Sequence, residues 1–200
     1  MLLPQASFYW KATYNKVIAS HNQLHVRKGG LSMIYETDPS RGEKPASESR
    51  AILTEIVFPS DTNHLQTMFG GIVMEYMDKV AAISAMRHSR TSVVTVSTDS
   101  IDFVAPIRVG EAIIVESFVS WTHRSSIEVF VKAVTENLKT GVRHTAVTAF
   151  FVFVALGDDG RPTPVPGVVP ETEEEQEMHI TGRDRYLLRR KRIDERKGQA

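Results

Sequence analysis

Cysteine is absent from the 200 residues of this chain. Its absence excludes a disulfide framework, a metal site with thiolate ligands and a thiol nucleophile. Neither sign of charge dominates, because 24 basic residues match 24 acidic ones, whereas a global binder of nucleic acid or anionic membranes carries a basic surplus. No apolar run approaches the roughly 18 residues of a membrane span, and the N-terminus lacks the basic and apolar regions of a secretory signal. We expect a cytoplasmic protein that binds neither nucleic acid nor membrane.

Several catalytic and nucleotide-binding fingerprints are also missing. The sequence contains no P-loop, no dinucleotide-binding glycine motif and no G-x-S-x-G nucleophile elbow. The histidines of the central region form no pair with the H-x-x-x-H spacing of metal ligands; they are His64, His88, His123 and His144. We therefore expect no bound metal and no resident cofactor.

Composition divides the chain into four parts. Residues 1–50 show no sustained hydrophobic period and include the polar stretch TDPSRGEKPASESR, which indicates an N-terminal extension and linker. Residues 51–160 form the central domain, residues 161–170 a proline-rich connector that cannot continue a sheet, and residues 171–200 a charged tail.

The first part admits two interpretations. The codons of Lys28-Gly29-Gly30 can spell a purine-rich bacterial ribosome-binding sequence, and Met33 stands at a suitable distance to be the true start. The alternative is an ordinary extension translated from Met1. The sequence leaves both open, and the mass of the intact native protein distinguishes them.

The tail has an acidic beginning and a basic end. Five of the seven residues from Glu171 to Glu177 are acidic, and eight basic residues follow between Arg183 and Lys197. Acid in the first turns and base in the last suit the macrodipole of a helix. The pattern predicts a polar helix outside the main core, either solvated or packed on another subunit rather than bound to nucleic acid.

Hydrophobic periodicity predicts a strand, one long helix and four further strands in the central domain. Residues 52–58 alternate and end at Pro59, as a strand does. Residues 70–87 repeat apolar side chains every three or four positions around most of the circumference, which predicts a helix buried on nearly all sides. Four β-rich stretches between residues 92 and 156 are joined by short polar breaks, which favour antiparallel pairing. The order predicts an α+β fold, a curved antiparallel sheet wrapped around one long central helix.

The start of this helix carries the residues best suited to chemistry. Gly70 and Gly71 leave backbone N–H groups exposed at the positive end of the helix dipole, where an oxyanion can bind, although a glycine pair can also serve close packing. Asp78 lies two turns further on, among apolar residues where a carboxylate is costly to bury. It is a candidate general base or nucleophile, but it can equally share a solvent-facing strip with Glu75 and Lys79.

The residues from Val57 to Glu111 resemble the cytosolic acyl-CoA thioester hydrolases of the hot-dog superfamily, and bacterial members in particular. Matching motifs occur in order as DTN, FGG, a Met-Asp pair, AMRH, VVT-S-D and F-x-x-P-x-x-x-G. The similarity covers about three quarters of the chain and continues into the charged tail. It implies a hot-dog fold and hydrolysis of acyl-CoA to a carboxylic acid and CoA, as in fatty acid metabolism.

The resemblance also implies a role for each site residue. Asp78 activates water or attacks the thioester carbon, Asn63 positions water or the carbonyl, and Gly70 and Gly71 supply oxyanion donors. Asn63 and Asp78 come from different subunits, so the working unit is a homodimer, and hexamers built as trimers of dimers occur in the family. Candidate contacts for the CoA nucleotide are Arg87, His88, Arg90, Thr122, Arg124, Ser125 and Ser126.

One departure from the family pattern follows Asn63-His64. Related sequences commonly carry His, Asn or Gly where this chain has Leu65 and Gln66. We expect Leu65 to reshape the acyl pocket and Gln66 to adopt the loop geometry that glycine or asparagine allows.

A second class of function stays open. Hot-dog domains also serve as non-catalytic modules that bind or sense acyl-CoA, and tight binding without turnover would indicate that class. A hot-dog hydratase fits less well, because no histidine and acid are paired in the expected helical context.

Overall fold

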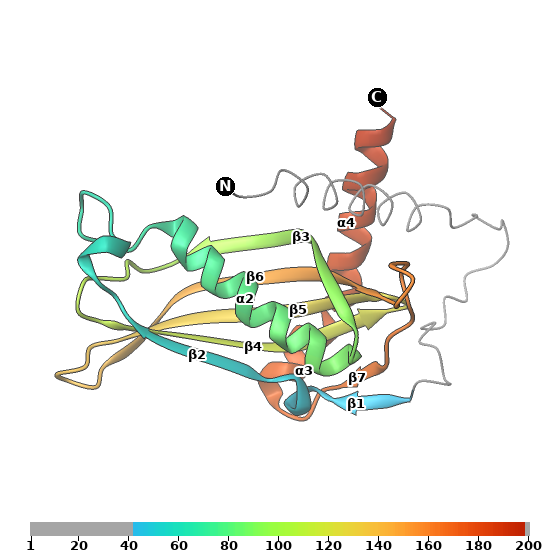
Figure 1. Ribbon diagram of the computed structural model, residues 1–200, viewed down its shortest axis with the longest axis horizontal. Coiled ribbons are helices and arrows are strands. Elements are labelled where there is room, and N and C mark those ends of the chain that lie inside the picture. The colour runs from blue at the N-terminus through green and yellow to red at the C-terminus, as the bar shows by residue number, and fades with distance from the viewer. Residues whose placement is uncertain (1–41, 199–200) are drawn as a thin grey trace, which may run out of the picture.

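The structure, a computed structural model, describes residues 42–198 (Figure 1). The predicted strand-helix-strand order is confirmed, with short elements added at both ends. The elements are β1 (Glu43–Pro45), the 3-10 turn η2 (Ala46–Ser49), β2 (Ala51–Ile56), the 3-10 turn η3 (Pro59–Asp61), α2 (Gly70–Ser89), β3 (Ser92–Phe103), β4 (Ala112–His123), β5 (Ser126–Glu136), β6 (Arg143–Leu156), β7 (Gly167–Val169), α3 (Glu173–Ile180) and α4 (Gly182–Lys197).

Five strands form one antiparallel sheet in the order β2-β4-β5-β6-β3. The inner strands β4, β5 and β6 are buried along most of their length, because helices cover both faces of the sheet. Strand β3 ends the sheet on one side and β2 on the other. This arrangement confirms the α+β plan of a curved sheet around a central helix.

Helix α2 lies across the inner face of the sheet (Figure 1). Its side chains Met77 and Val80 are almost fully buried, and burial of each contributes about 1.5–3 kcal/mol to stability. The small residue Ser84 lets the helix approach the sheet and shares a 2.7 Å hydrogen bond with Ser117 of β4. The helix ends at Arg90, which adopts a left-handed conformation with φ of 58°.

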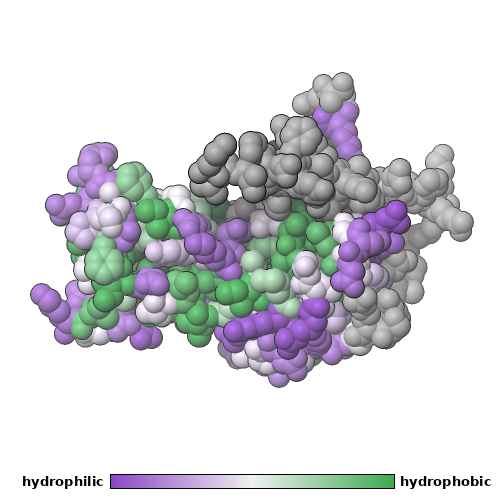
Figure 2. Space-filling view, in the orientation of Figure 1, coloured by the Kyte–Doolittle hydropathy of each residue, from purple (hydrophilic) through white to green (hydrophobic). Residues whose placement is uncertain are grey.

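The prediction that α2 is buried on nearly all sides is wrong for the single chain. Met74, Ile83 and Met86 remain 39–43% exposed on the face turned away from the sheet. Figure 2 shows hydrophobic surface on this side of the molecule. An apolar helix face of this kind needs a covering partner.

The N-terminal boundary also differs from the prediction, because residues 43–49 belong to the domain rather than to a linker. Strand β1 pairs in parallel with β7, and the turn η2 buries Ala46 and Ser49. The Ser49 hydroxyl donates to the Ala46 carbonyl at 2.6 Å and accepts from the Val119 N–H at 2.9 Å. Ser49 is buried through hydrogen bonds rather than apolar contacts, so hydrophobic periodicity does not detect this turn.

The charged tail forms two helices on the outer face of the sheet, not one. Gly182 begins α4 directly against Trp121 of β4, with no room for a side chain. Further along, Arg185 pairs at 2.7 Å with the buried carboxylate of Glu128, and Arg189 pairs with Glu128 and Asp99. None of the helices in residues 42–198 has the length and apolarity that a membrane crossing requires.

Candidate active site

The N-terminus of α2 is left without a capping group. The residue before the helix, Phe69, is extended and offers no side-chain cap, and the first turn holds no acidic side chain. The Phe69 carbonyl accepts from Ile72 and Val73 at 3.0 and 3.1 Å, so the N–H groups of Gly70 and Gly71 precede the first helical donors. The positive end of the helix dipole is therefore free to bind an anion.

The two glycines serve different purposes. A Cβ at Gly70 would stand 3.2 Å from the ring of Phe103, so close packing explains this glycine. A Cβ at Gly71 would meet nothing within 4 Å, so packing inside the chain does not require the second glycine. The open space beside Gly71 is on the side from which a ligand or a partner chain can approach.

An apolar cavity opens beside this helix end. Its volume is about 280 Å³, and its lining residues are Thr67, Met68, Gly70, Val73, Phe103, Val104, Ala105, Pro106 and Ile107. Leu65, expected to shape the acyl pocket, is 68% exposed and is not among the lining residues. The cavity suits a short apolar group placed next to the helix dipole.

The loop before α2 is held by the side chain of Asn63. Its amide Nδ2 donates to Thr67 Oγ1 at 3.0 Å, and its Oδ1 accepts from the Leu65 N–H at 2.8 Å. Between them Gln66 has a φ of 57°, which confirms that this residue takes the left-handed geometry expected for glycine or asparagine.

Asp78 faces β3 rather than solvent. Its Oδ1 accepts a 2.9 Å hydrogen bond from the hydroxyl of Thr95, and the side chain is half-buried. The neighbouring acid and base, Glu75 and Lys79, are exposed and pair with each other at 2.5 Å. Asp78 is therefore separate from the solvent-facing strip, and the interpretation of Asp78 as a surface residue loses its main support.

No hydrogen bond joins Asn63 to Asp78 in the part of the chain that the structure describes. Asn63 lies in the loop before Gly70, and the eight helical steps from Gly70 to Asp78 cover about 12 Å. The side-chain hydrogen bonds of Asn63 stay in its own loop, whereas Asp78 bonds to β3. Within one chain the two side chains are thus oriented by different elements.

The structure gathers the predicted CoA contacts around one connector. The last turn of α2 touches it through His88, whose Nε2 lies 3.0 Å from the Pro166 carbonyl. The turn between β4 and β5 touches the adjacent residue, since the Val165 N–H donates to the Arg124 carbonyl at 2.8 Å. The end of α2 and the β4–β5 turn, about 35 residues apart in sequence, thus lie close together at this connector.

Only part of this predicted set is accessible. His88 is fully buried, so it cannot contact a ligand as expected; its burial lowers its pKa, and its Nδ1 has no hydrogen-bond partner. Thr122 of β4, Ser125 of the following turn and Ser126 of β5 are also buried. The exposed cationic members are Arg87, Arg90 and Arg124.

No group of three or more His, Asp or Glu side chains in residues 42–198 is placed to hold a metal ion. His21 and His25, which stand four positions apart, lie outside the described residues.

Comparison with known proteins gives this geometry a family. Residues 65–142 match the family model of the thioesterase superfamily. Over 145 residues the chain is 50% identical to an acyl-CoA thioester hydrolase of Bacillus subtilis, covering 72% of this chain and 84% of that protein. The chain belongs to the acyl-CoA thioester hydrolases of the thioesterase superfamily. It spans only 38% of the human cytosolic acyl coenzyme A thioester hydrolase, to which it is 41% identical over 143 residues.

Solved thioesterase structures share the hot-dog fold of this chain. A hexameric acyl-CoA thioesterase is 45% identical, with a TM-score of 0.74 over 76% of this chain and 97% of its own. An acyl-CoA hydrolase of Staphylococcus aureus bound to butyryl coenzyme A and coenzyme A is 41% identical, with a TM-score of 0.75 over 78% and 96%. These relatives confirm the predicted fold and family.

Three variants of the Staphylococcus aureus hydrolase carry alanine in place of an asparagine, an aspartate and a threonine. The aspartate follows the asparagine by 15 positions and precedes the threonine by 17. Asn63, Asp78 and Thr95 have the same separations in this thioesterase. Sequence reasoning gave Thr95 no role although it lies in the VVT-S-D motif, because a threonine in a strand is ordinary until its contact with Asp78 is seen.

Proposed function

We propose that this thioesterase hydrolyses acyl-CoA thioesters to a carboxylic acid and CoA, with Asp78 as the general base. The observation that carries the proposal is the Asp78–Thr95 hydrogen bond of 2.9 Å. It turns a carboxylate away from the exposed Glu75–Lys79 pair and fixes its orientation. The matching separations in the Staphylococcus aureus variants support the same three residues.

The chemistry follows from this orientation. Thr95 occupies Oδ1 of Asp78, and Oδ2 takes a proton from water as the water oxygen bonds to the thioester carbon. The negative charge that develops on the carbonyl oxygen is stabilised by the N–H groups of Gly70 and Gly71, and one such donor usually contributes on the order of 10²–10³ in turnover. The C–S bond then breaks, and CoA leaves as a thiolate that regains a proton. Direct attack by Asp78 on the thioester carbon is the alternative first step.

The site is shared between two copies of the chain. Since Asn63 precedes α2 and Asp78 lies about 12 Å beyond the start of that helix, a second copy supplies the missing member. A two-fold axis that joins them passes between these positions, beside the exposed Met74. Such an axis also sets two β3 edges side by side and covers the apolar face of α2. One matched thioesterase is hexameric, which is compatible with three such dimers.

The CoA nucleotide is bound at the connector end of α2. Arg87, Arg90 and Arg124 are exposed there, and guanidinium groups bind phosphates through paired N–H donors. The matched Staphylococcus aureus hydrolase binds coenzyme A, which supports a CoA site without placing it.

Turnover is tested with acyl-CoA substrates of increasing length and a thiol-trapping reagent that detects released CoA. We expect Asp78→Asn to lower kcat by about 10²–10⁴, the usual contribution of a general base. The matched control is Glu75→Gln, which changes an exposed acid of the same helix. Normal rates in Asp78→Asn would refute the role of Asp78, and tight acyl-CoA binding without turnover by the native chain would make it a sensing module.

Mixing two inactive variants tests whether the site is shared. Asn63→Ala and Asp78→Ala chains are unfolded together, refolded at equal amounts and assayed. If the two residues act from different subunits, half of the dimers are mixed and each holds one intact site, which restores about a quarter of native activity. If both act from one chain, every site lacks a residue and no activity returns.

A further inference from the structure

Helix α4 crosses the outer face of the sheet from β4 to β3. It begins at Gly182 against Trp121 of β4, and Arg192 pairs at 2.5 Å with Asp99 of β3. Ten helical residues span about 15 Å, which matches three strand spacings of about 4.8 Å. The helix therefore runs almost straight across the strands. Its arginines pair with the carboxylates of Glu128 on β5 and Asp99 on β3.

The end of α4 continues beyond the sheet. Strand β3 is the last strand on this side, so residues 193–197 lie past its edge over a length of about 7 Å. Figure 1 shows α4 continuing past β3. Leu188, on a flank of the helix, is 62% exposed. Residues 194–197 of the projecting turn are exposed.

We infer that the projecting end of α4 lies on the sheet of a second copy of this chain, so that two α4 helices cross the β3 edges antiparallel and side by side. The inference rests on the shared dimer proposed above, which sets the two β3 edges together. Each tail would then brace the partner that completes its active site.

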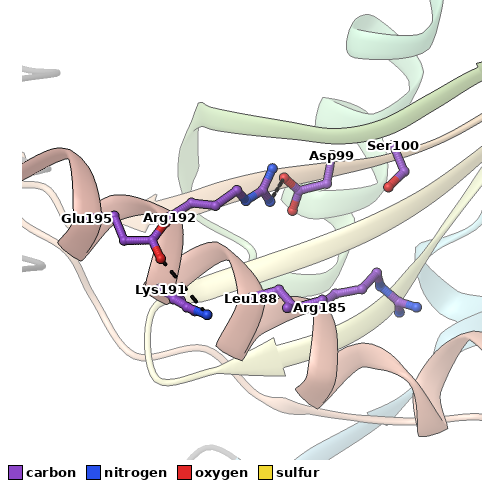
Figure 3. Close-up of a pocket in the computed structure, with 7 residues that line it drawn as sticks. All are labelled: Asp99, Ser100, Arg185, Leu188, Lys191, Arg192 and Glu195. Carbon is purple, nitrogen blue, oxygen red and sulfur yellow. Dashed lines mark hydrogen bonds and ion pairs between the residues drawn. The ribbon is translucent and has the colours of Figure 1, made fainter.

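A groove along α4 accepts the second helix. It has a volume of about 430 Å³ and opens on one flank of α4 (Figure 3). Its lining residues are Asp99, Ser100, Arg185, Leu188, Lys191, Arg192 and Glu195. One strand spacing of about 4.8 Å equals roughly three helical residues, so Glu195 stands beside the partner's Arg192, and the two-fold axis repeats this pair of opposite charges.

Helix packing distance then predicts which partner residue lies under the tail. Packed helices lie about 8–10 Å apart, or roughly three residues along a strand. A tail that crosses its own β3 at Asp99 therefore reaches the second copy near Asp102. The projecting turn carries Arg196 and Lys197, and the carboxylate of Asp102 is exposed.

Asp102 is on the correct face for this contact. It stands opposite Thr148 of β6, which stands opposite Lys132 of β5. Lys132 pairs at 2.7 Å with Glu174 of α3 on the outer face. Since facing residues in register share one side of a sheet, Asp102 points to the side on which α4 runs.

Single cysteines test the arrangement, because the chain has none of its own. Glu195→Cys places a thiol on the groove flank of α4, and Arg190→Cys places one on the opposite flank. With a short bis-maleimide we expect Glu195→Cys to form covalent dimers at least tenfold faster than Arg190→Cys. Equal rates in chains that sediment as dimers would overturn the inference. A native chain that sediments as a monomer at assay concentration would instead refute the shared dimer.

Charge reversal gives an independent measurement. We expect Asp102→Lys to raise the dimer dissociation constant at least tenfold, and the double variant Asp102→Lys with Lys197→Glu to recover most of that loss. Failure of the second substitution to restore the dimer would overturn the contact between the tail and the partner's strand. Recovery of activity in the mixture of Asn63→Ala and Asp78→Ala would still report separately on the shared site.

Discussion

The hydroxyl of Thr95 donates a hydrogen bond to Asp78, and in the proposed mechanism this bond orients the carboxylate toward water. We expect Thr95→Val, which keeps the shape and removes the donor, to lower kcat about 10- to 100-fold, since a hydrogen bond to a charged group contributes about 1.5–3 kcal/mol. KM should change little, and Thr95→Ser should restore most of the rate. Steady-state kinetics with one acyl-CoA measure both constants.

Thr98 provides the control for this substitution. It lies in the same strand with an exposed side chain, so Thr98→Val should keep native kinetics. An unchanged kcat in Thr95→Val would mean that the hydrogen bond only fixes local packing.

His88 makes stability depend on pH. Burial lowers the pKa of His88, so the folded chain holds a neutral imidazole. No hydrogen-bond acceptor in residues 42–198 is placed to stabilise a proton on its Nδ1. The unfolded chain binds that proton at pH values below about 6.5. The free energy of unfolding should therefore have its highest value above pH 6.5 with respect to this group. It should fall as the pH drops below 6.5, with a slope that approaches about 1.4 kcal/mol per pH unit.

Urea denaturation from pH 8 to pH 5 measures this slope. The variant His88→Gln should flatten it, whereas His144→Gln, at an exposed position, should leave it unchanged. The same slope in native and His88→Gln chains would contradict the assignment.

At the scale of elements, the contact between α4 and the sheet depends on one glycine. A Cβ at Gly182 would lie 2.6 Å from the side chain of Trp121, which is buried and cannot move away. We expect Gly182→Ala to cost about 1–3 kcal/mol through overpacking, although alanine favours helix elsewhere. Thermal unfolding and hydrogen exchange in α4 should report the loss, and Gly198→Ala, where a Cβ meets only ordinary contacts, should show none.

Periodicity predicted the long elements because a half-buried strand and an amphipathic helix repeat their apolar residues. Helix α2 begins at the expected residue and ends within two residues of the expected position. The ion pairs of the tail could not be predicted in the same way. Arg189 is buried only because Asp99 and Glu128, 90 and 61 residues away, converge on it.

The candidate site shows the same division. The sequence singled out Asp78 and the glycines, since an acid or a glycine pair in an apolar helix is unusual. It did not decide between base and surface residue, because the answer depends on Thr95, which reaches Asp78 from another element. His88 illustrates the opposite error, since a histidine next to arginines suggests a ligand contact until its burial is seen.

For the whole molecule, the apolar face of α2 predicts a dimer that activity requires. We expect Met74→Lys to dissociate the dimer and to lower activity with it. Beside the two-fold axis the lysines of the two copies would repel each other and would lose their hydration. Sedimentation and hydrolysis should change together, while circular dichroism stays native. Ile180→Lys, at a position 76% exposed on α3, should retain both. A monomeric Met74→Lys chain with full activity would contradict a shared site.

The parallel pair of β1 and β7 has a mechanical consequence. Its partners run from Glu43 beside Gly167 to Pro45 beside Val169, so the chain enters one strand and leaves the other at opposite ends. Tension applied between residue 42 and residue 170 would pull the two strands in shear, loading every hydrogen bond of the pair at once instead of peeling them singly. The β1–β7 pair therefore resists force applied along the chain, and it must break before the force reaches the five-stranded sheet and the helix that carries Asp78.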